Sequence, residues 1–109
     1  MARRRRLGEF ALIARYFAPL ARGFAGAGGL RSDNAFLPAD AARDLVVKTD
    51  TVVSGVHFLE DEAAPRVAAK ALRVCLSDLA AGGATPFAYQ LSLALPRAWR
   101  EPWVAGFAR

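Results

Sequence analysis

The chain has 109 residues, of which 54% are hydrophobic and 23% are charged, and its formal net charge at pH 7 is +5. This length suits one small domain with a single core, and the hydrophobic share excludes an intrinsically disordered chain. No apolar stretch approaches the roughly 20 residues of a membrane-spanning helix, because charged residues or proline interrupt each one, so we expect no membrane partner.

The first seven residues form a basic arm, with four consecutive arginines from Arg3 to Arg6. Such an arm can contact nucleic acid, but no aromatic interleaving or nucleic-acid motif accompanies it, and we expect a solvated arm and no nucleic-acid partner. Glu9, Arg15 and Pro19 interrupt the apolar region that a signal peptide needs, so we expect no export. The single cysteine, Cys75, agrees with a reducing cytoplasm, where we place the protein.

Apolar residues at spacings of three and four, from Phe10 to Leu20, predict an amphipathic helix over residues 8–21. The glycines of segment 23–29 then indicate a linker without regular structure. A phosphate-binding loop is disfavoured there, because no Gly-Lys-Ser or Gly-Lys-Thr follows and Arg31 replaces the last glycine of a Gly-x-Gly-x-x-Gly pattern.

The rest of the chain alternates predicted strands and helices. A second helix is predicted over 64–81, with Gly82 and Gly83 as its stop signal. The clearest strand is 87–95, where apolar and small or polar residues alternate. The predicted strands are 34–37, 44–49, 51–56 and 87–95, with a turn at 38–40 between the first two. Together with the helices they predict an α/β fold class: a mixed sheet of roughly four strands with helices on one face.

Trp99, Trp103 and Phe107 are four residues apart and predict the start of a third helix within residues 97–109. Its apolar face has little chain left to cover it, so we interpret the sequence as cut short before a further domain. The predicted organisation is a basic arm at 1–7, one domain at 8–96 and an incomplete helix at 97–109.

Three acids stand at the ends of regular elements on separate segments: Asp33, Asp50 and Asp78. Carboxylates without a Cys or His cluster suit Mg²⁺, which binds few protein ligands and leaves room for phosphate oxygens. Thr49, beside Asp50, offers oxygens to complete a coordination shell. Asp78 is near the C-terminal end of a predicted helix, where its charge opposes the helix dipole, and a nearby cation would explain it. The acids therefore indicate phosphoryl chemistry.

Four blocks in this order and spacing carry a family resemblance: residues 8–17, 49–58, 77–82 and 91–96. The chain resembles the N-terminal part of the thiamine-monophosphate kinase family, within the aminoimidazole ribonucleotide synthetase-like superfamily. The resemblance implies an enzyme about three times this long, in which paired domains form a barrel across a homodimer. It also implies transfer of the γ-phosphoryl group of ATP to thiamine monophosphate, with Mg²⁺ and ATP as cofactors, in thiamine biosynthesis.

The resemblance implies that Asp33, Asp50 and Asp78 are magnesium ligands and that His57 contacts the substrate. It marks no catalytic residue here and leaves the ATP-binding residues undefined. Ser32 and Lys48 depart from the family pattern, which often has a second aspartate and a Ser or Thr ligand at these positions. An ammonium cannot coordinate a metal, so Lys48 is either solvated or a phosphate contact.

Three alternatives remain open. A sister enzyme such as aminoimidazole ribonucleotide synthetase would share an ATP and magnesium site. A non-catalytic fragment that only folds or dimerises is the preferred interpretation of the 109 residues by themselves. A nucleic-acid-binding module built on the Arg3 to Arg6 arm would show salt-dependent binding to DNA or RNA.

Overall fold

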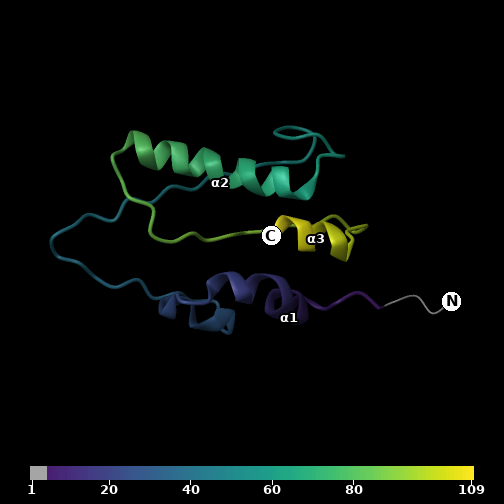
Figure 1. Cartoon of the computed structure of the whole chain (residues 1–109), viewed down its shortest axis with the longest axis horizontal. Coiled ribbons are helices and arrows are strands. Elements are labelled where there is room, and N and C mark those ends of the chain that lie inside the picture. The colour runs from purple at the N-terminus through teal and green to yellow at the C-terminus, as the bar shows by residue number, and fades with distance from the viewer. Residues whose placement is uncertain (1–4) are drawn as a thin grey trace. The chain divides into compact units, whose positions relative to one another are not determined.

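The computed structural model describes residues 5–109 of the chain. These residues divide into two compact units, the first ending at Arg43 and the second running from Asp44 to Phe107 (Figure 1). The first four residues, and with them Arg3 and Arg4 of the predicted basic arm, lie outside the described residues. Within the described part of the chain, no helix has the length and apolar character needed to cross a membrane.

The first unit begins with a helical path that follows the predicted helix closely. It consists of α1 (Glu9–Leu12), a π-helical turn (Ile13–Phe17) and a 3-10 turn (Ala18–Ala21). Pro19 has no amide hydrogen to donate to the carbonyl four residues before it, which accounts for the departure from α-helical geometry at this point. The prediction of a helix over 8–21 is therefore confirmed in extent, but its geometry changes along its length.

The glycine-rich segment is not the irregular linker that its composition predicts. Residues Ala25–Leu30 form 3-10 turns, in which Gly28 and Gly29 have positive φ angles of 56° and 66°. The chain then folds back, and the amide of Phe36 donates a 2.8 Å hydrogen bond to the carbonyl of Gly26. A Cβ at Gly26 would lie only 1.9 Å from the Phe36 carbonyl oxygen, so this close approach requires glycine.

A turn around Asp40 ends the first unit. The Asp40 Oδ1 atom accepts a 2.9 Å hydrogen bond from the amide of Ala42, and Oδ2 lies 3.2 Å from Nε of Arg43. An aspartate that binds the amide two residues ahead is a common way to stabilise a turn. The turn thus begins where the predicted turn at 38–40 ends.

The second unit is organised by the 18-residue helix α2 (Ala64–Ala81), which has the predicted bounds. It ends in a Schellman motif: Gly83 adopts a φ of 69°, its amide binds the carbonyl of Ala80, and the amide of Ala84 binds that of Leu79. The glycine stop signal is therefore confirmed.

Helix α3 (Glu101–Phe107) packs against α2 and lies within the predicted range 97–109. Val67 of α2 is 3% exposed and Val104 of α3 is fully buried. Gly106 lies at this helix contact, where a Cβ would meet Ala64 and Pro65 at an ordinary van der Waals distance of 3.5 Å. The rings of Trp103 and Phe107 stack with centroids 5.4 Å apart. This helix pair holds the most deeply buried side chains of the described residues.

The predicted four-stranded sheet is not found among residues 5–109, where the recorded β-pairing is one isolated bridge between Ser54 and Phe58. The segments predicted as strands have extended or irregular backbone, and their apolar side chains are exposed: Phe36 by 75%, Val47 by 76% and Tyr89 by 66%. This part of the fold prediction is not confirmed in the described residues. The physical reason is that a strand makes its hydrogen bonds to a neighbour, which local sequence does not supply.

Candidate functional site

A tight turn over residues 54–58 fixes the position of His57. The amide of Val53 donates a 2.9 Å hydrogen bond to Nδ1 of the His57 ring, and the amide of His57 donates a 2.8 Å bond to the Val53 carbonyl. Gly55, with a φ of 77°, closes the turn by donating to the Phe58 carbonyl at 2.7 Å. Because Nδ1 accepts a hydrogen bond, the neutral imidazole carries its proton on Nε2, which can donate to a ligand.

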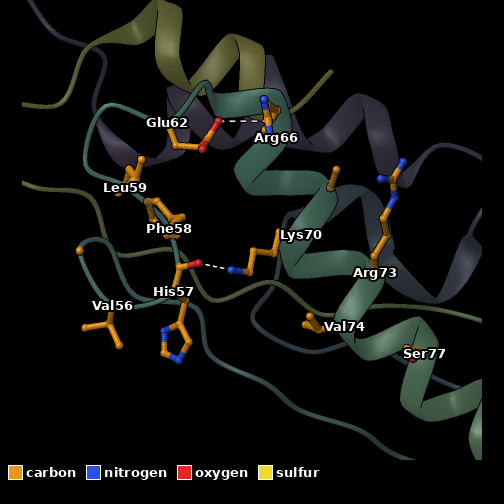
Figure 2. A pocket seen from close by; sticks show the side chains of 12 residues that line it. Val56, His57, Phe58, Leu59, Glu62, Arg66, Lys70, Arg73, Val74 and Ser77 are labelled. Carbon is orange, nitrogen blue, oxygen red and sulfur yellow. Dashed lines mark hydrogen bonds and ion pairs between the residues drawn. The ribbon is translucent and has the colours of Figure 1, made fainter.

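The turn faces helix α2 across an open cavity of about 760 Å³ (Figure 2). Lys70 of α2 donates a hydrogen bond from Nζ to the backbone carbonyl of His57 and so ties the turn to the helix. The cavity is lined by the turn and one face of the helix: Gly55, Val56, His57, Phe58, Leu59, Glu62, Arg66, Ala69, Lys70, Arg73, Val74 and Ser77.

Three basic residues of α2 line this cavity, at positions 66, 70 and 73. Arg66 forms an ion pair with Glu62 at 3.1 Å, whereas Lys70 contacts the His57 carbonyl. With the Nε2 donor of His57, these groups make the wall suitable for an anionic ligand such as a phosphate ester. The sequence analysis missed this basic row, although its spacing of four and three residues on a predicted helix was a sufficient signal.

The second part of the site brings Asp50 and Asp78 to one cation, the side chain of Lys48. The Lys48 Nζ atom lies 2.7 Å from Oδ2 of Asp78 and 3.7 Å from Oδ2 of Asp50. The Asp50 Oδ1 atom accepts a 3.0 Å hydrogen bond from the amide of Thr51. The hydrogen bond to Asp78 is the main cause that raises the pKa of Lys48 above its ordinary value, with burial opposing it and the charges of both acids adding to it.

The Lys48 ammonium is the nearby cation that the sequence analysis expected for Asp78, whose charge opposes the helix dipole. Asp78 is four residues from the Gly82 cap of α2, whose amide binds the Asp78 carbonyl at 3.1 Å. A carboxylate in the last turn of a helix is repelled by the negative end of the helix dipole. A positive charge 2.7 Å away offsets this repulsion. Neither interpretation of Lys48 from sequence, as a solvated side chain or a phosphate contact, included this pair.

Two of the predicted metal ligands, Asp50 and Asp78, are placed so that they fit a magnesium ion. Oxygens of Asp50 and Asp78 reach one ammonium nitrogen, so both acids are close enough to share a cation. Mg²⁺ is commonly held by one or two carboxylates together with phosphate oxygens and water. In residues 5–109 no group of three or more His, Cys, Asp or Glu side chains is gathered for a metal. The fit is thus to a two-carboxylate site that a phosphorylated ligand would complete.

The other predicted site residues are less closely defined. Asp33 is exposed and belongs to the first unit, where the neighbouring Ser32 Oγ accepts a 3.0 Å hydrogen bond from the amide of Asn34. Thr49 is exposed and lies between Lys48 and Asp50 in the second unit. Their roles as metal ligands stay predictions. Cys75 is a free, half-buried thiol.

Comparison with known proteins places the chain in a family. The sequence profile described as "AIR synthase related protein, N-terminal domain" matches residues 31–109. The chain is 46% identical over 104 residues to the thiamine-monophosphate kinase of Caulobacter vibrioides, covering 92% of this chain and 30% of the relative. It is 44% identical over 102 residues to that of Salmonella typhimurium, covering 93% and 31%.

A cyanobacterial relative gives a similar result: the chain is 40% identical over 99 residues to the thiamine-monophosphate kinase of Synechococcus elongatus, covering 90% of this chain and 29% of the relative. The chain therefore spans about 30% of the length of these relatives. No solved structure matches the chain.

Proposed function

The chain belongs to the AIR synthase related family through its N-terminal domain, and on this premise we propose that it is the N-terminal part of a thiamine-monophosphate kinase. The identity of 40 to 46% to relatives of that name supports this proposal over a sister enzyme of the superfamily. The reaction we propose is transfer of a phosphoryl group from ATP to the phosphate of thiamine monophosphate, in the cytoplasm.

One observation carries the proposal: Asp50 and Asp78 approach the same cation, the Lys48 ammonium, at 3.7 and 2.7 Å. These residues belong to the same unit as the cavity beside His57, which is lined by basic residues of α2. An anionic phosphate that attacks an anionic triphosphate is repelled by it, so the enzyme mainly has to neutralise charge and align the two groups. We propose that Thr49, Asp50 and Asp78, which all belong to the second unit, hold Mg²⁺. The ligand role of Asp33, in the first unit, stays a prediction of the family resemblance. When bound, Mg²⁺ would offset the charge of the phosphate oxygens.

We assign the cavity beside His57 to the phosphorylated substrate. The Nε2–H of His57 can donate to a phosphate oxygen, and the cationic side chain of Lys70, which reaches toward the turn from α2, favours an anion (Figure 2). The hydrogen bond from Lys70 to the His57 carbonyl keeps the turn against α2, so that both walls stay in place. Binding and orientation, rather than covalent chemistry, are the tasks of these residues.

We further propose that the extended segments complete the family's sheet in the whole protein, as a homodimer. Val47 and Tyr89 are 76% and 66% exposed, and apolar strand sequences of this kind are buried when strands pair. For the 109 residues by themselves, this exposure favours the second candidate, a fragment that associates without catalysing the reaction.

The test compares the full-length enzyme with its Asp50→Asn and Asp78→Asn variants at saturating Mg²⁺. Each variant is expected to lose activity by about a hundredfold or more while its circular dichroism stays unchanged, because a charge is removed where the phosphates meet. Asp40→Asn is the matched control, since Asp40 is paired with Arg43 in an exposed turn. Wild-type turnover in both site variants would refute the metal assignment.

His57→Ala separates the substrate wall from the metal site. If His57 contacts thiamine monophosphate, the variant should raise the KM for that substrate more than the KM for ATP. An equal increase in both, together with a lower melting temperature, would instead assign His57 to the turn alone.

A further inference from the structure

Lys48 contacts two acids that come from different segments of the second unit. Its Nζ atom reaches Asp78 on α2 at 2.7 Å and Asp50, two residues along its own segment, at 3.7 Å. The Lys48 side chain is 32% exposed, and those of Asp50 and Asp78 are 42% and 54% exposed. Two other ion pairs are simpler, because each joins residues three or four positions apart: Arg43 with Asp40 and Arg66 with Glu62.

The lysine uses the same oxygens that a metal would need. Both contacts are made to Oδ2 atoms, and an ammonium group donates hydrogen bonds but has no lone pair to offer a metal. With Lys48 present, the three side chains carry a net charge of −1 rather than −2. A divalent cation that binds both acids must therefore displace the ammonium or bind close to it, and like charges repel.

We infer that Lys48 is an internal counter-ion that holds Asp50 and Asp78 together before metal binds and competes with the divalent cation for them. The inference rests on the proposed role of the two acids as metal ligands. The lysine thus sets the metal affinity of the site: it lowers the affinity for free metal ions and favours metal that arrives already bound to phosphate groups, which add negative charge and attract the ammonium.

The expected size of the effect follows from Coulomb's law. A unit charge about 4 Å from a divalent cation changes its binding by about tenfold or more, even at the high dielectric constant of an exposed site. An exposed ion pair contributes little to folding, so the fold should tolerate the loss of Lys48. Metal affinity and stability should therefore respond differently to the same substitution.

The experiment measures Mn²⁺ binding to the full-length protein without nucleotide, from the electron paramagnetic resonance signal of free Mn²⁺, with Mg²⁺ as competitor. Lys48→Met removes the charge and keeps most of the length. Lys48→Arg keeps the charge. Arg43→Met is the matched control, because it removes one positive charge from an exposed ion pair with Asp40. Asp50→Asn and Asp78→Asn define the site, and circular dichroism checks the fold of each variant.

Lys48→Met should bind Mn²⁺ about tenfold more tightly than the wild type, with Lys48→Arg and Arg43→Met within about twofold of it. Equal or weaker binding by Lys48→Met, or the same tightening by Arg43→Met, would overturn the inference. If Asp50→Asn and Asp78→Asn weaken Mn²⁺ binding but Lys48→Met does not tighten it, the counter-ion role fails while the proposed metal site stands. If neither asparagine variant changes Mn²⁺ binding, both fail.

Discussion

Helix α2 and the segment that follows it, residues 84–96, have comparably apolar sequences but very different surroundings. The helix buries Val67 to 3% exposure, whereas the segment leaves Phe87 59% and Tyr89 66% exposed. A helix makes its backbone hydrogen bonds within itself and needs only one partner face, which α3 provides. A strand needs a neighbour for every pair of backbone bonds. The comparison teaches that a helix of this chain can form and pack by itself, whereas an equally apolar strand segment stays exposed until it finds a strand to pair with.

The largest effect is expected where packing is complete. Val104→Asp places a carboxylate at a fully buried position between α2 and α3. An unpaired buried charge costs about 4 kcal/mol or more, which is enough to unfold the helix pair. Urea denaturation followed by circular dichroism measures the loss. Val47→Asp is the control. Because Val47 is 76% exposed in the 109-residue chain, this substitution should leave the helix content of the chain unchanged. Equal loss in both variants would remove the contrast between the two regions.

Self-association is expected where packing is incomplete. The 109-residue chain should form dimers or larger species, because exposed apolar segments of strand-like sequence pair with other copies. Tyr89→Lys places a charge in the middle of the segment and should shift the chain toward monomer, as measured by size-exclusion chromatography with light scattering. Lys is used because charged residues on strand edges oppose pairing. A wild-type chain that is monomeric at high concentration contradicts this prediction.

The end of α2 allows a finer test of the boundary between the two regions. Gly83 has a φ of 69°, so Gly83→Ala should lower stability by about 1 kcal/mol, because a side chain strains the left-handed conformation. Gly82→Ala is the matched control at the adjacent position, where φ is −82° and a Cβ would make ordinary contacts at 3.6 Å. Thermal melts should separate the two variants. Equal destabilisation by both would show that the Schellman turn does not stop the helix.

The smallest effect concerns pH and the Lys48 ion pair. The pKa of Lys48 is raised above 10.5 in the folded chain, chiefly by the hydrogen bond to Asp78. A raised pKa of a basic group adds stability that is fully present below the unfolded value and disappears as the pH rises through the folded value. The melting temperature of the wild type should therefore exceed that of Lys48→Met slightly at neutral pH, and the difference should disappear as the pH rises through the folded pKa of Lys48. A difference in melting temperature that grows with pH would contradict a stabilising Lys48–Asp78 ion pair.

Parts of the fold that depend on neighbours in sequence were predicted well. The apolar spacing around Leu72 and Leu79 and the glycines at 82 and 83 predict the approximate bounds of α2, because helix and cap are built from local hydrogen bonds. The helical path from Glu9 to Ala21 was also predictable, although not its π and 3-10 geometry.

The candidate site was predictable only in its components. The sequence indicates Asp50, Asp78 and His57 as residues with a chemical role, from their positions at element ends and from the family resemblance. It does not indicate that Lys48 joins the two acids, because that depends on how segment 44–53 lies against α2. The prediction of a metal role for Asp33 and Thr49 stays a prediction.

The amino-acid sequence by itself determined helix α2 with its glycine cap, the extent of the N-terminal helical path and the set of acids, since each depends on residues within a few positions of one another. Only the tertiary structure decided which groups meet: Lys48 with Asp50 and Asp78, Lys70 with the His57 carbonyl, and the cavity between the turn and α2. The physical reason is that the Lys48–Asp78 and Lys70–His57 contacts join residues 30 and 13 positions apart, and such contacts depend on packing that no local pattern encodes.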